Sequence, residues 1–329
     1  MKYRKLGQDL SVSAIGVGCM TMVGGSNIVY GDADEAESLA TLDRAVDLGV
    51  TFFDTAEIYG PFTNEEFLGR ALRGRMHQLV IASKFGFRFG EGGSIAGADS
   101  SPANIRRAID GTLQRLGIDT IDLYYQHRVD RSVPIEETVG ALAELVTQGK
   151  IRHIGLSEAA PETIRRAHAT FPITALQSEY SLWERGVEDG ILPLCEELGI
   201  GFVPYSPLGR GFLTGQIRTL ADLPANDYRH NDPRMAQGYF EANLAIVDVA
   251  RSIADRHDAT AAQVALAWLL GRGDKVVPIP GFKRRVTLED SVRAVDLVLD
   301  AQDVAELDAA GAKVQGMRYR EAAMKMVRL

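Results

Sequence analysis

Two kinds of hydrophobic pattern alternate along the chain. Short runs rich in valine, isoleucine, phenylalanine and leucine indicate buried strands, and between them apolar residues recur at helical spacing. Residues 34–48 illustrate the helical pattern, because Leu42, Ala45 and Val46 share one stripe and the segment ends at Gly49. After an N-terminal hairpin (3–6 and 10–12), the predicted strands are 14–18, 50–54, 78–84, 121–127, 151–157, 173–177, 201–205 and 275–279. The predicted helices are 34–48, 64–72, 102–116, 135–148, 161–169, 191–198, 240–257, 261–270, 288–298 and 302–312.

Eight strand-then-helix units over about 300 residues predict parallel pairing and a closed barrel. We therefore expect one α/β domain, residues 1–329, folded as a (β/α)8 TIM barrel with a short N-terminal β-hairpin and C-terminal helices. A doubly wound open sheet is the alternative. Its dinucleotide-binding fingerprint is incomplete here, because Thr21 stands where the third glycine after Gly16 and Gly18 belongs.

Three finer features also follow from the pattern. Thr63 is expected to cap the helix 64–72, with Glu66 completing a capping box. Residues 85–100 form a glycine-rich segment that we expect to be a loop. The long polar segment 206–238 is interpreted as a functional loop on the barrel rim, because unstructured loops of that length are otherwise uncommon.

Composition narrows the class of protein. The 329 residues are 46% hydrophobic and 24% charged, which is typical of a globular chain and not of a disordered one. The net charge of −8 gives no electrostatic signature for nucleic acid or an anionic membrane. Cys19 and Cys195 belong to no CxxC pair, and the N-terminus lacks a signal-peptide pattern. We expect a cytoplasmic protein without a metal, a membrane or a nucleic-acid partner; a homo-oligomer stays open.

Chemistry-bearing residues stand at the expected strand ends. The second, third and fourth strands end in Asp54, Lys84 and His127, and Tyr59 follows Asp54 by five residues. The carboxyl ends of barrel strands gather at one face, so these four side chains are expected to converge. An apolar strand has no structural need for a lysine or a histidine at its tip. We interpret the four residues as a catalytic group.

These side chains suit the polarisation and protonation of a carbonyl oxygen. A lysine ammonium beside a tyrosine favours the phenolate, so we expect Lys84 to lower the pKa of Tyr59, while Asp54 keeps the lysine charged. His127 can donate a second hydrogen bond to the same oxygen. No nucleophile–base pair and no metal-binding motif accompanies them. The missing partner is then an external hydride donor, which is the chemistry of a cofactor.

Several long motifs give the chain a family resemblance. The string FDTAEIYG around Asp54 and Tyr59 resembles the signature of the aldo-keto reductase superfamily, and SKFG and YYQHR place Lys84 and His127 at that family's catalytic positions. The strings GKIRHIGLS, YSPLGRG and IPG extend the resemblance over nearly the whole chain. QHRVD and SPLGRGFLTG are similar to the perakine-reductase-like and auxin-induced-protein-like branch.

The resemblance implies an NADPH-dependent reductase of aldehydes or ketones, with Tyr59 as general acid assisted by Lys84, Asp54 and His127. It also implies three groups of cofactor-binding residues. These are Ser157, Gln177 and Tyr205 for the nicotinamide, Ser206, Leu208, Gly209 and Arg210 for the pyrophosphate, and Gly281, Lys283 and Arg284 for the adenosine phosphate. The chain departs from the family pattern at Glu158, Phe282 and the pair Asp290-Ser291.

A second function of this family is regulatory, as a cofactor-binding subunit of a channel with slow turnover. The barrel pattern begins by residue 3, without the appended segment expected of such a subunit, so the sequence favours the enzyme. The physiological substrate is not specified. Candidate pocket walls are Met20, Met22, Tyr59, Phe85, Phe87, Arg128 and residues 317–319.

Overall fold

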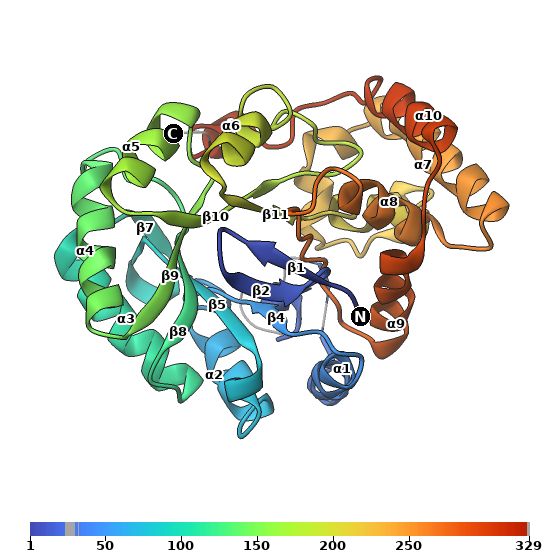
Figure 1. Ribbon diagram of the computed structural model, residues 1–329. Helices are drawn as coiled ribbons and strands as arrows, with labels where there is room; N and C mark the ends of the chain where they lie inside the picture. Colours follow the sequence, from blue (N-terminus) through green and yellow to red (C-terminus); the bar gives the residue numbers. More distant parts are fainter. Residues whose placement is uncertain (24–29, 32, 328–329) are drawn as a thin grey trace.

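The computed structural model describes residues 1–23, 30–31 and 33–327, and its centre is a parallel sheet wrapped by helices (Figure 1). Within these residues, seven parallel strands lie in the order β11-β10-β9-β8-β5-β4-β3, so neighbours in the sheet are also successive along the chain. The strands are β3 (Val17–Gly18), β4 (Phe52–Asp54), β5 (Val80–Phe85), β8 (Ile121–Gln126), β9 (Ile151–Ser157), β10 (Ile173–Glu179) and β11 (Gly201–Tyr205).

The barrel is closed by the segment predicted as the eighth strand. Residues 276–281 join β11 through two parallel bridges, Phe202 with Val276 and Tyr205 with Ile279. On the other side a bridge between Gly18 and Gly281 joins them to β3. Pro278 and Pro280 interrupt this segment, and a proline cannot donate to a strand ladder. Their carbonyl groups still accept from Gly16 and Gly18 at 3.0 and 2.9 Å. The predicted (β/α)8 barrel is therefore confirmed, with an irregular eighth strand.

The predicted N-terminal hairpin is also present and fills one end of the barrel. Strands β1 (Tyr3–Leu6) and β2 (Leu10–Ser13) pair antiparallel and lie across the opening that faces the viewer in Figure 1. The Leu6, Leu10 and Val12 side chains are buried in the same apolar cluster as the barrel interior. The apolar side chains of the hairpin therefore close this end of the barrel.

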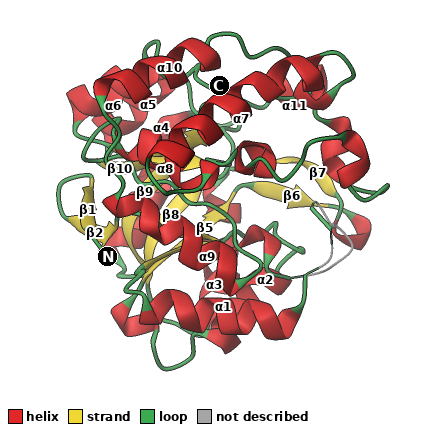
Figure 2. Cartoon of the chain, turned by 90° about the vertical axis from the view of Figure 1, so that its right-hand side faces the viewer, coloured by secondary structure: helices red, strands yellow, loops and turns green. Residues whose placement is uncertain are grey.

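The helices cover the outer face of the sheet (Figure 2). They are α1 (Glu35–Asp47), α2 (Thr63–Ala71), α3 (Pro102–Leu116), α4 (Ile135–Thr147), α5 (Pro161–Thr170), α6 (Ile191–Leu198), α7 (Tyr239–Arg256), α8 (Ala261–Leu270), α9 (Arg285–Val292), α10 (Ala301–Gly311) and α11 (Glu321–Met324). Local signals explain several starts: Asp34 accepts hydrogen bonds from Ala36 and Glu37 before α1, and Ser101 caps α3 just before Pro102. None of the helices in the described part is both long and apolar enough to cross a membrane.

Two local expectations were wrong. The capping box at Thr63 is absent, because the N-cap residue of α2 is Phe62 with φ 69°, and Thr63 already belongs to the helix. The segment 85–100 is not a loop. It contains an antiparallel hairpin of β6 (Phe87–Phe89) and β7 (Ile95–Ala98), which Figure 2 shows at the end of the barrel opposite β1 and β2. Alternating Phe87, Arg88 and Phe89 carry a strand pattern that the nearby glycines obscure.

The polar segment 206–238 and the region after α9 also differ in detail from the prediction. The polar segment contains four short 3₁₀ turns and no α-helix. The expected helix 288–298 begins earlier, at Arg285, and gives way to a 3₁₀ turn over Arg293–Asp296. Both differences concern boundaries and leave the barrel topology unchanged.

Glycine packing between α2 and α3 leads to a stability prediction. A Cβ atom at Gly69 would meet the carbonyl oxygen of Arg115 and lie 3.0 Å from that of Leu116, so the helices must separate. We expect Gly69→Ala to lower the free energy of unfolding by about 1–3 kcal/mol. Gly140 in α4 has open space at that position, and Gly140→Ala should raise stability by about 0.5–1 kcal/mol. Urea denaturation of both variants measures this; equal effects would contradict the packing argument.

Candidate active site

A buried ion pair lies at the carboxyl ends of β4 and β5. Lys84 is fully buried and its Nζ atom forms an ion pair with Asp54. The same nitrogen donates to the Thr55 carbonyl oxygen at 2.9 Å and contacts the Tyr59 hydroxyl oxygen at 3.4 Å. The structure therefore brings three of the four expected catalytic residues into one hydrogen-bonded chain.

The sheet register explains this arrangement. Asp54 pairs with Ala82 in the parallel ladder, so Lys84 lies two residues further along the neighbouring strand. After β4 the chain continues along β5, because the amide of Thr55 donates to Ala82 and that of Glu57 donates to Lys84. The turn then returns Tyr59 over the lysine.

Gln177 on β10 contacts the Asp54 carboxylate across the barrel. Its Nε2 atom donates to the second Asp54 oxygen at 2.8 Å. Burial raises the pKa of Asp54, and Lys84 and Gln177 oppose that effect. Burial would lower the pKa of Lys84, but Asp54 and Tyr59 outweigh it, so the pKa of the lysine is raised. The lysine is therefore a fixed positive charge at neutral pH.

The pKa of Tyr59 differs from the prediction. Burial raises the pKa of its phenol, and the Lys84 charge offsets only part of that rise. Lys84 cannot cancel the effect of burial, because the neighbouring Asp54 carboxylate disfavours the phenolate and opposes the effect of the lysine charge. Tyr59 is consequently a protonated hydroxyl group at neutral pH.

His127 follows β8 directly and faces the same centre. Its backbone amide donates to the Phe85 carbonyl oxygen at 2.8 Å, and its ring lies edge-on to Tyr59 and Phe87, with centroids 6.0 and 5.1 Å away. Burial, with Arg128 and Lys84 nearby, holds the pKa of the imidazole well below its usual value. Its Nδ1 atom is buried and has no partner among the described residues. A neutral imidazole with an unmatched nitrogen is suited to a polar ligand.

The residues expected at the nicotinamide lie beside this centre and have protein partners. Ser157 ends β9, and its hydroxyl oxygen accepts from Arg128 at 3.2 Å. The Tyr205 hydroxyl group at the end of β11 is 2.9 Å from that of Tyr319, which comes from the C-terminal segment 317–320. Gln177, as described above, contacts Asp54. The three side chains come from the neighbouring strands β9, β10 and β11.

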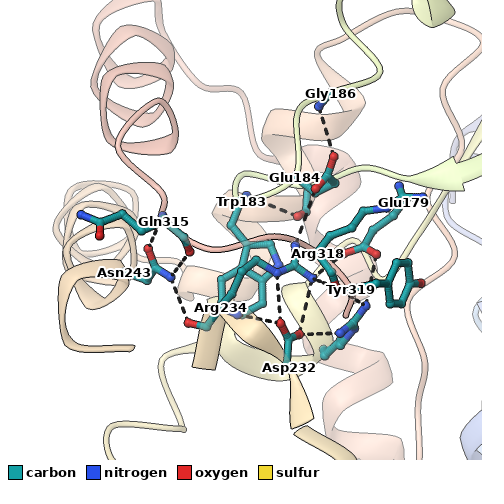
Figure 3. Close-up of polar contacts among 12 residues, drawn as sticks. Glu179, Trp183, Glu184, Gly186, Asp232, Arg234, Asn243, Gln315, Arg318 and Tyr319 are labelled. Carbon is teal, nitrogen blue, oxygen red and sulfur yellow. Dashed lines mark hydrogen bonds and ion pairs between the residues drawn. The ribbon is translucent and has the colours of Figure 1, made fainter. Parts of the chain in front are cut away.

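Arg210 lies in a cluster of buried ion pairs, and Figure 3 shows the contacts of Arg234 with Asp232 and Glu179 in this cluster. Its guanidinium pairs with Asp232 and lies 3.2 Å from Glu179, to which Arg234 donates at 2.8 Å. Arg318 pairs with Glu158 at the end of β9. The cluster comprises Glu158, Glu179, Arg210, Asp232, Arg234 and Arg318, all of them buried. It anchors the long polar segment and the C-terminal segment to the barrel, a role that the sequence did not indicate.

Left-handed backbone is concentrated around these residues. Glu158, Ser206 and Arg210 have φ angles of 57°, 49° and 57°, which side-chain-bearing residues rarely adopt. Gly209 and Gly211 flank Arg210 with φ angles of 56° and 91°. Backbone of this kind is costly and is found mainly at functional sites. Leu208 precedes this turn and packs against the core.

The residues expected at the adenosine phosphate follow the eighth strand and lead into α9. Lys283 donates to the carbonyl oxygens of Tyr30 and Gly31 at 2.5 and 2.7 Å. Arg284 is exposed at the start of α9, and Gly281 is the bridge partner of Gly18. Among the described residues, no three His, Cys, Asp or Glu side chains are placed to hold a metal ion.

Glu57 was not identified from the sequence, although it lies next to the expected catalytic residues. It is 4% exposed, and its carboxylate accepts from the amide of Gly86 at 3.1 Å. Burial and the neighbouring Glu65 raise the pKa of Glu57 to about 7, against the opposing effect of Arg115. The adjacent Phe87 contacts the His127 ring, so Glu57 supports one wall of the site. Only its position in FDTAEIYG could have drawn attention to it.

Glu57 makes the stability of the protein pH-dependent. Its folded-state pKa of about 7 exceeds the ordinary value of 4.5, so the folded state keeps a proton that the unfolded state loses. Stability therefore falls between pH 4.5 and 7, and above that window the loss is about 3 kcal/mol. The stability of Glu57→Gln relative to the wild type should therefore be higher at pH 8 than at pH 4 by about 3 kcal/mol.

Thermal or urea unfolding of both proteins at the two pH values measures the difference. Glu136→Gln is the control, because Arg166 lowers the pKa of that exposed glutamate and no alkaline gain follows. A constant difference between wild type and Glu57→Gln across the pH range would refute the raised pKa.

Comparisons with known proteins identify the family of the chain. The sequence pattern of the Aldo/keto reductase family matches residues 14–312. A probable aldo-keto reductase 1 from Glycine max is 45% identical over 306 residues, which cover 92% of this chain and 87% of that protein. The glycerol dehydrogenase AKR11B4 from Gluconobacter oxydans superposes with a TM-score of 0.86 at 29% identity, covering 95% of both chains. The holo form of the aldo-keto reductase AKR11C1 from Bacillus halodurans has a TM-score of 0.77 at 28% identity, covering 98% and 99% of the two chains. The chain belongs to the aldo/keto reductase family.

Proposed function

We propose that this protein is an NADPH-dependent reductase that converts an aldehyde or a ketone to an alcohol, with Tyr59 as general acid. The observation that carries the proposal is the position of Lys84, which pairs with Asp54 and lies 3.4 Å from the Tyr59 hydroxyl oxygen. This geometry sets a buried positive charge beside the oxygen that releases the proton.

The side chains divide the chemistry between them. The raised pKa of Tyr59 keeps its hydroxyl group protonated, so it holds the proton that a reduced carbonyl oxygen takes up. Lys84 stabilises the phenolate that remains. His127 is neutral, so its ring can donate a hydrogen bond to the same carbonyl oxygen without adding charge. Bound NADPH supplies the hydride for the carbonyl carbon.

The cofactor residues named from the sequence fit NADPH in their grouping. Ser157, Gln177 and Tyr205 lie on the neighbouring strands β9, β10 and β11 and would hold the nicotinamide. Ser206, Leu208, Gly209 and Arg210 follow Tyr205 in a turn with several left-handed residues and would hold the pyrophosphate. Gly281, Lys283 and Arg284 would bind the adenosine phosphate. Lys283 would then exchange the carbonyl oxygens of Tyr30 and Gly31 for phosphate oxygens.

Replacement of the acid tests the catalytic assignment. Tyr59→Phe should lower kcat about 10²–10⁴-fold because only the proton donor is lost, and NADPH binding should stay near the wild-type value. Tyr3→Phe, at a residue that is 57% exposed on the N-terminal hairpin, is the matched control. NADPH oxidation with small aldehydes measures turnover, and fluorescence titration measures cofactor binding. Turnover within tenfold of the wild type would rule out Tyr59 as the acid.

Replacement of the cations after the eighth strand tests cofactor choice. Lys283→Ala with Arg284→Ala should weaken NADPH binding about ten- to a hundredfold, because charge-assisted contacts to one phosphate are lost. NADH lacks that phosphate and its affinity should stay unchanged. Arg165→Ala with Arg166→Ala removes two consecutive cations from the exposed face of α5 and serves as the control. Equal NADPH and NADH affinities in the wild type would contradict the assignment.

A further inference from the structure

Arg128 is an arginine at the catalytic centre that the proposed chemistry does not use. It follows His127 and is partly buried. Its Nη1 atom donates to the His127 carbonyl oxygen at 2.7 Å and to the Ser157 hydroxyl oxygen at 3.2 Å. Its charge acts on Tyr59 and Tyr205, so the guanidinium lies among the side chains of the proposed site. Both of these hydrogen bonds are made by the same nitrogen of the Arg128 guanidinium.

The other arginines of this region differ from Arg128 in their partners. Arg210, Arg234 and Arg318 each pair with at least one buried carboxylate. Arg128 has no carboxylate within ion-pair distance among the residues that the structure describes. The nearest carboxylate that acts on Arg128 is Glu158, and its ion pair is with Arg318.

The unanchored edge of the guanidinium is open to a ligand. Nε and Nη2 of Arg128 have no hydrogen-bond partner among the described residues. Neither atom is among the fully buried nitrogens without partners, which include atoms of Arg234 and Arg318. Neither nitrogen is therefore fully buried. A guanidinium edge of this kind matches the two oxygens of a carboxylate.

We propose that Arg128 binds a carboxylate group of the substrate, so that the preferred substrates are oxo acids: aldehydes or ketones that also carry a carboxylate. This inference rests on the proposed reductase function and adds the substrate class. Tyr59 and His127 engage the carbonyl oxygen, and Arg128 fixes the other end of the molecule.

The surroundings strengthen such a contact. Arg128 is partly buried, so a carboxylate beside it is screened less than at the surface. The His127 ring, one residue before it, packs edge-on against Phe87, so apolar groups line this part of the site. The chain as a whole carries a net charge of −8, so an anionic substrate needs a local cation of this kind.

The experiment compares two substrates that differ only in charge, 4-oxobutanoate and its methyl ester, at saturating NADPH. In the wild type we expect kcat/KM for the acid to exceed that for the ester at least about tenfold. Arg128→Met should reduce this preference about ten- to a hundredfold, mainly through KM for the acid. Arg128→Lys keeps the charge without the planar edge and should retain an intermediate preference.

The matched control is Arg88→Met on β6. Arg88 is exposed on the neighbouring hairpin and donates to the Ala96 carbonyl oxygen, so the variant removes one positive charge near the mouth without touching the site. The preference for the acid should survive in this variant. Its loss there would mean that general electrostatic attraction, and not Arg128, selects the acid, and would overturn the proposal.

Other outcomes separate the proposal from the function on which it rests. Reduction of the ester without a preference for the acid would leave the reductase standing and refute the role of Arg128. A fall in NADPH affinity in Arg128→Met, with the preference unchanged, would assign the arginine to the cofactor through Ser157 and also refute it. Calorimetric titration with 4-oxobutanoate decides the case without turnover: binding equal to that of the ester, or unchanged in Arg128→Met, overturns the proposal.

Discussion

The ion pair between Lys84 and Asp54 is the interaction on which the rest of the site depends. A fully buried ammonium needs both a counter-charge and hydrogen-bond acceptors, and removal of one partner from such a pair typically costs about 3–5 kcal/mol. The acceptors here are Asp54, the carbonyl of Thr55 and the hydroxyl of Tyr59. Because Asp54 also holds Gln177, the pair ties β4 and β5 to β10. The Tyr59 hydroxyl group is thus held in place as one of the acceptors of the Lys84 ammonium.

The two ends of the barrel are built from different forces. The hairpin closes one end with the apolar side chains of Leu6, Leu10 and Val12. The other end is held by ion pairs, in which Glu158 and Glu179 at the tips of β9 and β10 meet arginines from distant segments. Hydrocarbon packing is non-directional, whereas ion pairs orient the groups that form them. The polar end is therefore the end at which side chains can be positioned for chemistry.

Much of the fold could be predicted from the sequence, because each strand and helix carries its own periodicity. The alternation predicted the barrel, and the strand tips gave Asp54, Lys84 and His127. Contacts between segments that are far apart in the sequence leave no pattern in the sequence of either segment. The pairing of Arg318 with Glu158, the raised pKa of Glu57 and the position of Phe62 as N-cap of α2 all follow from tertiary neighbours. The β6–β7 hairpin was missed because its glycines resemble loop composition.

The pairing of Arg318 with Glu158 also sets an order of assembly. The two residues are 160 positions apart, and at about 5–20 residues per second a ribosome adds the arginine roughly ten to thirty seconds after the glutamate. During that interval the strands that carry Glu158 and Glu179 can pair, but their carboxylates lack the arginines that permit burial. The polar end of the barrel must therefore stay hydrated in the nascent chain until the segment that carries Arg318 has been synthesised.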